Sequence, residues 1–583
     1  MNMRKTKIIC TLGPAVDHAE TIERLIRTGM NAARFNFSHG SHAEQLARLN
    51  MFKKVRDTLG APVATILDTK GPEIRIKTFA DGPVTLEQGQ GFILTTDDVP
   101  GDGRRVSVTY ANLHKEVGPG CRILVDDGLI ELRVQKVEGH EIHCEVENGG
   151  PLSSNKSINI PDVHILLPSL TDKDREDLKF AVDNDFDFIA ASFVRKASDV
   201  EDIRAELRKH GGDNIRIIAK IENREGVENL EGIIAASDGI MVARGDMGVE
   251  IDFTELPIIQ KDMIAQCVAA GKPVITATQM LDSMMENPRP TRAEITDVAN
   301  AIYDGTSAIM LSGETAAGKY PVEAVQTMDA IALRTEADIN YAKRMRNLPG
   351  SSRLSIAAAT AHAACTTAMD IGADAILTVS QSGATARLVS RFRPGTTVVA
   401  CLLSERVQRQ MALYWGVVPL LMPYAQNTDQ LIEFAIQAAE KAELVKQGDL
   451  VVITAGVPVG VSGTTNMIKV HLVGGALLNA VGVGASNASG PLCVCRSLED
   501  VAAKFRPGDV LVVPYTTNDL LPYIRQAAAV ISEESGTNGH AATVGLTLGK
   551  AVIVGAAGAV QRLKDGAMVS VDCARGVVQT LPQ

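Results

Sequence analysis

The stretch IRIIAKIENREGVENLEGIIAASDGIMVARGD, residues 215–246, decides the fold. It holds two apolar runs, IRIIAKI (215–221) and GIMVA (239–243), separated by a segment long enough for a helix. Runs of Ile and Val that are apolar on both faces are typical of strands in a parallel sheet. An acidic residue follows each run, Glu222 after the first and Asp246 after the second. The stretch therefore predicts a strand–helix–strand unit with polar side chains at its strand ends.

The same pattern occurs eight times in the first 314 residues. The runs are KIIC (7–10), AARFNF (32–37), VATIL (63–67), FDFIAASF (186–193), IRIIAKI (215–221), GIMVA (239–243), PVITAT (273–278) and SAIML (307–311). Eight strand–helix units match the closure of an α/β fold, the (β/α)8 TIM barrel, whose chemistry lies at the carboxyl ends of the strands. The polar residues at or just beyond those ends include Asn36, Ser38, Asp68, Thr69, Lys220, Glu222, Asp246, Thr278 and Glu314.

Length and composition limit the other possibilities. A chain of 583 residues is too long for one core and predicts roughly three to four domains. The net charge of −11 argues against nucleic acid or an anionic membrane as a partner. Nine scattered Cys without a paired framework favour a reduced compartment. No apolar run has the length of a signal peptide or a membrane span, so we expect a cytoplasmic protein.

The spacing of the strands predicts an inserted domain. More than a hundred residues separate the third run from the fourth. This insert contains short alternating segments, CRILVDDGLIELRVQKV (121–137) and EIHCEVENGG (141–150), which indicate antiparallel strands joined by Gly and Asp turns. We expect a small β-barrel domain over 71–165, and a catalytic barrel made of 1–70 and 166–347. A domain tethered there can act as a lid that excludes water, or can be a passive decoration.

Two further units are expected after the barrel. New apolar runs alternate with helix-like segments over 348–474, which predicts an α/β domain. The Gly-, Ser- and Asn-rich stretch GVGASNASGP (482–491) has the composition of a linker. Residues 487–583 then form an extra α/β domain that the barrel chemistry does not require.

The strand ends also predict a chemistry. Glu222 and Asp246 follow successive strands, so their carboxylates can share one cation, and two carboxylates with added waters suit Mg²⁺. Lys220 lies on the same face of its strand as Glu222. The guanidinium group of Arg34 can bind two phosphate oxygens at once. Singly, a strand-end Asp is more often a helix cap and a lone Lys is usually solvated. Their joint occurrence at one barrel mouth favours a metal–phosphate site.

Several segments resemble the pyruvate kinase family. The quoted matches are AARFNFSHG (32–40), LDTKGPEIR (67–75), AKIENREGVEN (219–229), VARGDMGVEI (242–251) and ITATQMLDSMMENPRPTRAEITDVANAIYDGTSAIMLSGETAAGKYPVEAV (275–325). The resemblance covers roughly residues 4–474. It implies an enzyme that transfers the phosphoryl group of phosphoenolpyruvate to ADP in glycolysis, giving pyruvate and ATP, and it suggests a homotetramer.

The resemblance also implies a role for each site residue. Mg²⁺ (or Mn²⁺) would be held by Glu222 and Asp246. K⁺ would be held by Asn36, Ser38, Asp68 and the Thr69 carbonyl. The substrate contacts would be Arg34, Lys220, Gly245, Asp246 and Thr278, and the nucleotide contacts Asn36, His39 and Arg75. The catalytic set would be Lys220 and Arg34, which stabilise the phosphoryl group, with Thr278, Ser312 and Glu314 in the relay that protonates the enolate. Glu73 stands where potassium-dependent members carry Glu.

A loop in the second domain is a candidate effector site. The segment TVSQSGATA (378–386) follows an apolar run and precedes a helix-like one, so its amides and hydroxyls can bind phosphate or can form a capped turn. It resembles the effector loop of the family, which implies Ser380, Ser382, Gly383 and Thr385 as ligands. Residues 456–474 also match and are expected to line the same cleft. We expect control by a sugar phosphate or a nucleoside monophosphate, between which the sequence does not choose.

The last hundred residues resemble a different family. Residues 506–555 look like the mobile phosphohistidine domain of phosphoenolpyruvate synthase and pyruvate phosphate dikinase. His540 falls at the phosphorylated position, but the usual Thr-Ser-His is here Asn538-Gly539-His540. No donor domain accompanies it, so we expect a structural or interface role and a surface His540 without chemical duty.

Two other functions compete with the kinase. A barrel lyase or aldolase acting on pyruvate-like enolates also pairs Glu and Asp at strand ends, but leaves the inserted domain and residues 67–75 unexplained. A phosphometabolite sensor with a decayed barrel is the non-enzymatic alternative. The intact set of Lys220, Glu222, Asp246 and Thr278 argues against decay.

Overall fold

The eight predicted strands close into a parallel barrel in the computed structural model, which describes residues 3–161, 163–346, 354–457, 465–474, 476–484 and 486–581. The order around the barrel is β1-β17-β16-β15-β14-β13-β3-β2. The bounds are β1 Lys7–Leu12, β2 Ala32–Asn36, β3 Ala64–Asp68, β13 Phe188–Ala191, β14 Arg216–Ile221, β15 Gly239–Ala243, β16 Val274–Ala277 and β17 Ala308–Leu311. The predicted TIM barrel is therefore confirmed.

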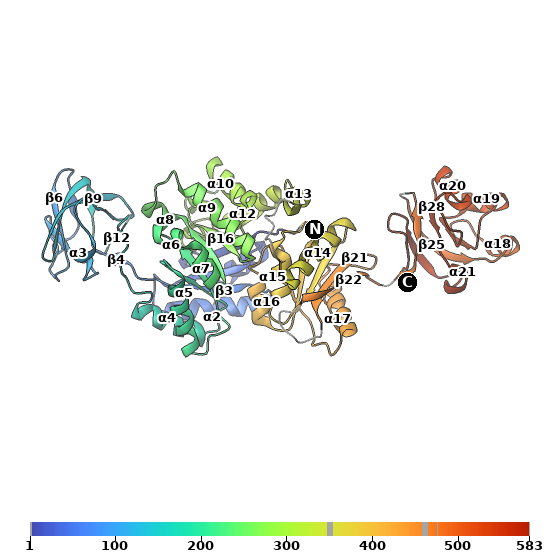
Figure 1. Ribbon diagram of the computed structural model, residues 1–583, viewed down its shortest axis with the longest axis horizontal. Helices are drawn as coiled ribbons and strands as arrows, with labels where there is room; N and C mark the ends of the chain where they lie inside the picture. The colour runs from blue at the N-terminus through green and yellow to red at the C-terminus, as the bar shows by residue number, and fades with distance from the viewer. Residues whose placement is uncertain are drawn as a thin grey trace. The chain divides into compact units, whose positions relative to one another are not determined.

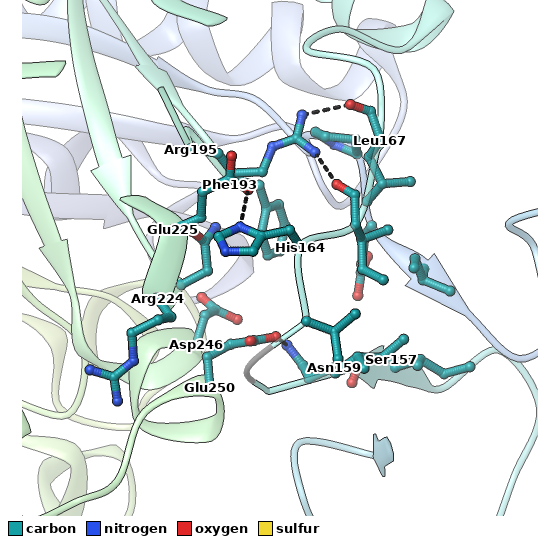
Figure 2. A pocket seen from close by; sticks show the side chains of 18 of the residues that line it. Ser157, Asn159, His164, Leu167, Phe193, Arg195, Arg224, Glu225, Asp246 and Glu250 are labelled. Atoms are coloured by element: carbon teal, nitrogen blue, oxygen red, sulfur yellow. Dashed lines mark hydrogen bonds and ion pairs between the residues drawn. The ribbon is translucent and has the colours of Figure 1, made fainter. Parts of the chain in front are cut away.

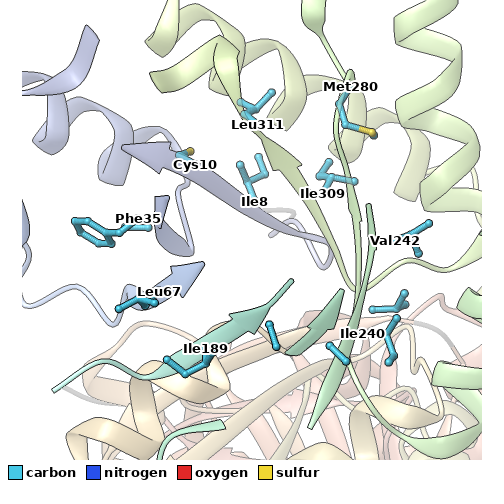
Figure 3. Close-up of a cluster of buried hydrophobic side chains, with 14 of the residues drawn as sticks. Ile8, Cys10, Phe35, Leu67, Ile189, Ile240, Val242, Met280, Ile309 and Leu311 are labelled. Atoms are coloured by element: carbon cyan, nitrogen blue, oxygen red, sulfur yellow. The ribbon is translucent and has the colours of Figure 1, made fainter. Parts of the chain in front are cut away.

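Strand residues alternate between two apolar cores. Ile9 belongs to the cluster inside the barrel, whereas its neighbours Ile8 and Cys10 belong to the cluster between the strands and the outer helices (Figure 3). Because successive side chains of a strand point to opposite faces, a strand that is buried on both faces is a continuous apolar run. Helices surround the strands (Figure 1). They include α1 Ala19–Thr28, α2 His42–Leu59, α4 Asp172–Asp183, α5 Ala197–Lys209, α7 Leu230–Ala236, α9 Leu256–Ala270, α10 Arg292–Asp304 and α12 Pro321–Glu336.

The outer helices begin at identifiable caps. At the start of α2 the Ser41 hydroxyl accepts a hydrogen bond from the amide of Glu44, whose carboxylate accepts one from the amide of Ser41. The same reciprocal box starts α4, with Thr171, and α10, with Thr291. Such a box satisfies amides that the first helical turn leaves without partners. The caps fix where each helix starts and hence the lengths of the loops at the barrel mouth.

The inserted domain is a small β structure between β3 and β13. A seven-stranded sheet has the order β4-β12-β8-β9-β10-β6-β7, and β5 pairs with β11. A bridge between Ile76 and Val108, with a 2.7 Å hydrogen bond from the Lys77 amide to the Ser107 carbonyl, joins its two edges. The bounds are β4 Ile74–Arg75, β5 Val84–Leu86, β6 Gly91–Thr95, β7 Arg105–Ser107, β8 Arg122–Val125, β9 Ile130–Glu138, β10 Glu141–Asn148, β11 Gly150–Leu152 and β12 Ser157–Asn159.

A further α/β part follows the barrel. Its five-stranded sheet has the order β20-β19-β18-β21-β22. The strands are β18 Ala375–Val379, β19 Thr397–Leu402, β20 Val417–Leu421, β21 Leu450–Gly456 and β22 Thr465–Leu472, and the helices are α14 Ile356–Asp370, α15 Ala384–Arg391, α16 Glu405–Met411 and α17 Thr428–Lys441. The predicted boundary at 347/348 lies outside the described residues.

The chain divides into two compact units, both of which take residues from the predicted domain 348–474. One unit comprises Met1–Met369, Leu377–Ala435 and Thr454–Met467, and the other Asp370–Ile376, Ile436–Ile453 and Ile468–Gln583. Within the described residues, no helix has both the length and the apolarity that a membrane span requires.

The predicted linker over 482–491 is wrong. These residues contribute to β24 (Val481–Val483) and β25 (Asn487–Val494), two strands of an eight-stranded sheet ordered β23-β30-β29-β25-β26-β27-β28-β24. Its glycines permit close backbone contact, since a Cβ on Gly482 would lie 1.7 Å from the Cys573 carbonyl oxygen. The sheet also begins before residue 487, with β23. The remaining bounds are β23 Ala476–Asn479, β26 Val510–Val513, β27 Ala529–Ser532, β28 Ala551–Val554, β29 Met568–Asp572 and β30 Val577–Thr580.

Candidate active site

A cavity of about 330 Å³ lies at the carboxyl ends of the barrel strands. Its lining includes many of the predicted site residues, namely Arg34, Asn36, Ser38, His39, Asp68, Glu73, Arg75, Lys220, Glu222 and Asp246. It also includes residues that the sequence did not single out, namely Lys70, Asp126, Asp127, Lys156, Ser157, Ser192 and Phe193. Side chains from the barrel and from the inserted domain therefore face one space.

A row of alternating charges crosses the floor of this cavity. The Arg34 Nε donates a 2.6 Å hydrogen bond to Oδ2 of Asp68. The Lys220 Nζ lies 3.2 Å from Oδ1 of Asp68 and 2.9 Å from Oε1 of Glu222. All four side chains are buried, so water screens these pairs weakly. The ion pairs hold the two cationic groups at fixed positions.

The charge states of this row follow from its contacts. Burial alone would raise the pKa of Asp68, but Arg34 and Lys220 bring that pKa below its ordinary value. Burial alone would lower the pKa of Lys220, but Asp68 and Glu222 hold it above its ordinary value. Both groups are therefore charged at neutral pH, and the site keeps a fixed ammonium.

Glu222 and Asp246 fit a divalent cation. The Phe193 amide donates to Oε2 of Glu222 at 2.6 Å, while Oε1 receives no hydrogen bond, because the nearby Lys220 lies outside hydrogen-bond geometry. Burial, with the charge of Asp246, raises the pKa of Glu222 to about 7. Two carboxylates that line the same cavity suit a divalent cation. No cluster of three or more acidic, His or Cys side chains that could hold a metal occurs among the described residues.

The predicted K⁺ ligands are only partly gathered. Asn36 and Asp68 are register partners at the ends of β2 and β3, and the Asn36 side-chain oxygen accepts from the Ser38 amide at 3.1 Å. These three residues line the cavity, whereas Thr69 does not. The Thr69 carbonyl oxygen instead accepts a 2.6 Å hydrogen bond from the Ser192 hydroxyl.

The predicted proton-relay residues lie outside the lining of this cavity. Thr278, directly after β16, has a left-handed backbone with φ 71°, and a Cβ on Gly245 would lie 2.8 Å from its methyl group. Glu314 accepts hydrogen bonds from the amides of Ser312 at 2.7 Å and Leu281 at 3.0 Å. Burial raises the pKa of Glu314. Glu314 therefore fastens together the loops that follow β16 and β17, and Gly245 lies against Thr278.

Ser192 is the central residue that the sequence reasoning missed. Its hydroxyl accepts a 2.8 Å hydrogen bond from Lys220 Nζ and lies 3.3 Å from Oδ1 of Asp68. The next residue, Phe193, has a left-handed backbone with φ 56°. The signal was present, because Ser192 is a polar residue at the end of the apolar run 186–193.

The inserted domain supplies a further cation. Lys156 lines the cavity, and its Nζ lies 2.8 Å from Oδ1 of Asp126. Arg75 forms a 2.7 Å pair with Glu73 and donates at 2.6 Å to the Asn155 carbonyl. These contacts place positive charge on the side of the cavity that the inserted domain forms.

The candidate effector loop leads into α15. Gly383, with φ 73°, precedes the helix, and Arg387 donates to the Ser382 carbonyl at 2.8 Å. The Thr385 hydroxyl is buried and lies 2.8 Å from the Thr465 hydroxyl, while Ser380 is partly exposed. Part of the matching segment 456–474, residues 458–464, lies outside the described residues.

His540 is the first residue of α20 (His540–Thr547). Its Nδ1 lies 2.8 Å from the Thr516 hydroxyl, and its Nε2 lies 3.2 Å from the Asn518 side-chain oxygen. The hydroxyl that the sequence lacks before His540 is thus supplied by another loop. Both ring nitrogens have partners within this unit.

Comparisons with known proteins agree with this architecture. The family model for the pyruvate kinase barrel domain matches residues 3–325, that for the pyruvate kinase alpha/beta domain matches 358–471, and that for the mobile domain of PEP-utilising enzymes matches 505–576. A pyruvate kinase of Geobacillus stearothermophilus is 48% identical over 577 residues, which cover 99% of this chain and 98% of that protein. A pyruvate kinase of Sporosarcina psychrophila is 47% identical, with 99% of each chain covered.

Proposed function

Because the chain belongs to the pyruvate kinase family, we propose that its barrel-mouth cavity transfers the phosphoryl group of phosphoenolpyruvate to ADP, as a step of glycolysis. The chain is a phosphotransferase whose substrates are phosphoenolpyruvate and ADP and which requires a divalent metal. One observation carries the assignment to this cavity: Arg34, Lys220, Glu222 and Asp246 line the same space.

Arg34 and Lys220 stabilise the phosphoryl group in this proposal. Phosphoryl transfer depends on positioning and on neutralising the negative charge of the transferred group. Asp68 holds both cationic groups, at 2.6 Å from Arg34 Nε and 3.2 Å from Lys220 Nζ. Because their positions are fixed before substrate binds, no reorganisation is needed when charge develops.

Glu222 and Asp246 hold Mg²⁺ or Mn²⁺. When bound there, the ion would supply positive charge to the phosphoryl group being transferred. The Phe193 amide orients Glu222 by its hydrogen bond to Oε2, and the ion would share Oε1 with the Lys220 ammonium, which lies 2.9 Å away. The rest of the coordination comes from substrate and water, which suits the reluctance of Mg²⁺ to lose its waters.

A K⁺ ion and the nucleotide bind in the same cavity. We assign K⁺ to Asn36, Ser38, Asp68 and the Thr69 carbonyl, with Glu73 setting the requirement for it. Oxygen ligands with one negative charge suit a monovalent cation. The nucleotide contacts are Asn36, His39 and Arg75, and Lys156 adds a cation from the inserted domain.

The enolate left by phosphoryl transfer needs a proton. Thr278, Ser312 and Glu314 form the relay, and a water ordered by Thr278 is the donor, because an alcohol is a weak acid. The close contact of Gly245 with Thr278, together with the Asp246 amide, makes a pocket for the substrate carboxylate.

Residues 71–165 act as a lid over this site. The protein is a homotetramer and is cytoplasmic in this proposal.

The loop that includes Ser380, Ser382, Gly383 and Thr385 binds a phosphorylated effector. A Ser- and Gly-containing loop at the start of a helix offers amides and hydroxyls to phosphate. For Thr385 to bind the effector, its hydroxyl must give up the hydrogen bond with the Thr465 hydroxyl and form one with the ligand. Substrate saturation curves that a panel of sugar phosphates and nucleoside monophosphates leaves unmoved would remove this part of the proposal.

A coupled assay tests the main proposal. Lactate dehydrogenase and NADH report pyruvate formed from phosphoenolpyruvate and ADP, with Mg²⁺ and K⁺ added in turn. A lyase or aldolase gives no signal that depends on ADP. An experimental structure in which the Glu222 and Asp246 carboxylates cannot reach one ion would overturn the assignment of the metal.

A further inference from the structure

A second cavity, of about 530 Å³, lies beside the catalytic one (Figure 2). One wall comes from residues 157–160 and 163–167, in the segment through which the inserted domain returns to the barrel, and the other from barrel residues 223–255. The two cavities share five lining residues, namely Glu73, Asp127, Ser157, Phe193 and Asp246. A volume of this size is that of a site for a small organic ligand.

The return segment gives this cavity an apolar wall. Its apolar lining residues are Ile158, Ile160, Val163, Ile165 and Leu167, joined by Pro72, Ile74 and Phe193. Figure 2 shows Leu167 and Phe193 on one side and the carboxylates of Asp246 and Glu250 on the other. A ligand with a hydrocarbon part would cover these apolar side chains and displace water from them, which favours binding.

The opposite wall is strongly negative. Five of the seven carboxylates that line the cavity lie on this wall, and the whole lining holds only two guanidinium groups. Arg195 is turned to the return segment, where it donates to the carbonyls of Ile165 at 2.9 Å and Leu167 at 2.7 Å. Arg224 pairs with Glu255 at 2.8 Å. His164, also in the lining, has its Nδ1 3.6 Å from Oε2 of Glu225. The seven carboxylates still outnumber these basic groups, and this negative charge disfavours an anionic ligand.

We propose that this cavity binds a small organic cation with an apolar body, such as an arylalkyl amine, and that the bound cation restrains the return segment against the barrel. The ammonium group lies near Glu225 and Glu228 of α6 (Arg224–Glu228), and the hydrocarbon part lies against Ile165 and Leu167. A ligand that touches both walls fixes their separation. It therefore lowers turnover, a consequence that rests on the proposed function of the neighbouring site.

Direct binding tests the site without using activity. Phenethylamine is titrated calorimetrically into the full-length protein with Mg²⁺ present, alongside two analogues of similar size, a neutral phenylalkyl alcohol and an anionic phenylalkyl carboxylate. We expect the amine to bind most tightly and the carboxylate not at all. The double variant Glu225→Gln/Glu228→Gln should weaken amine binding by roughly ten-fold, about three-fold for each carboxylate, and leave alcohol binding unchanged.

Glu231→Gln is the matched control, since Glu231 is exposed on the next helix and does not line the cavity. Equal affinities for amine and alcohol, or unchanged amine binding in the double variant, would overturn the site. At an amine concentration close to the wild-type Kd, turnover should fall in the wild type and much less in the double variant. Amine binding without any loss of turnover would overturn the restraint and leave the site standing.

Discussion

The backbone amide of Phe193 lies 2.6 Å from Oε2 of Glu222, so the loop after β13 holds the carboxylate that follows β14. Phe193 adopts a left-handed backbone to do so, with φ 56°. A bulky residue rarely takes this conformation, which costs about 1–2 kcal/mol. The fold accepts that cost at the point where one carboxylate oxygen must face the cavity.

Replacing Lys220 with Met should leave the fold intact and lower turnover by about 3 kcal/mol of barrier, roughly a hundred-fold. The reason is the loss of a fixed ammonium 3.2 Å from Asp68 Oδ1 and 2.9 Å from Glu222 Oε1. The coupled assay measures turnover, and the fluorescence of Trp415, the only Trp of the chain, reports folding. Near-normal turnover would remove Lys220 from the mechanism.

Replacing Ser192 with Ala should lower turnover about ten-fold. The Ser192 hydroxyl accepts from Lys220 Nζ and donates to the Thr69 carbonyl, and hydrogen bonds to charged groups contribute about 1.5–3 kcal/mol. Ser169→Ala is the control, because Ser169 also bonds a carboxylate, that of Asp202, but lies outside the cavity. Equal turnover in the two variants would show that Ser192 does not position Lys220.

Replacing Glu73 with Lys should relieve the requirement for K⁺. Glu73 faces the catalytic cavity and pairs with Arg75 at 2.7 Å. A lysine there adds the positive charge that we assign to the ion. Initial rates with KCl and with a tetramethylammonium salt at equal ionic strength measure the dependence. Full wild-type activity in the K⁺-free buffer would overturn the cation assignment.

Replacing Arg409 with Met should destabilise the chain by about 3–5 kcal/mol. Arg409 on α16 pairs at 2.9 Å with Asp187, a fully buried residue just before β13, and the variant leaves that carboxylate without its cation. Guanidinium unfolding followed by Trp415 fluorescence measures the change. Adding Asp187→Asn should restore part of the loss. A destabilisation below about 1 kcal/mol would contradict this account.

Lys7 should make stability depend on pH. Burial, reinforced by the charge of Arg4, lowers the pKa of Lys7 to about 7, from 10.5 when exposed. Between these values the unfolded chain binds more protons than the folded one, so wild-type stability rises with pH there. The variant Lys7→Met lacks this rise.

The stability of Lys7→Met relative to wild type should therefore fall by about 1–2 kcal/mol between pH 7.5 and pH 9. The hydrogen bond from Lys7 to the Val417 carbonyl is lost at both pH values and does not affect the difference. Unfolding curves at the two pH values test the sign. A difference that is constant with pH would mean that Lys7 is charged in the folded protein.

The barrel could be predicted from the sequence because its strands are buried on both faces. A continuous apolar run such as GIMVA (239–243) has few alternatives to a strand, and eight of them leave few topologies. The linker prediction over 482–491 failed because composition cannot distinguish a glycine that provides flexibility from one that allows two backbones to touch, as Gly482 does against Cys573.

Only those site residues that lie at the ends of barrel strands could be predicted from the sequence. Lys220 lies near the end of β14 and Glu222 directly after it, and both line the cavity. The inserted-domain cation Lys156 and the hydroxyl of Thr516 beside His540 could not be found this way, because each meets its partners only through tertiary folding.

Phe193, Thr278 and Gln279 all carry left-handed backbone at the mouth of the barrel. Glycine at these three positions would relieve about 1–2 kcal/mol each. Positions where a substitution would relieve strain thus lie at the mouth of the barrel, and one of them, Thr278, belongs to the proposed proton relay. Stability and turnover therefore depend on the same few residues. A substitution there that raises the free energy of unfolding is expected to lower turnover.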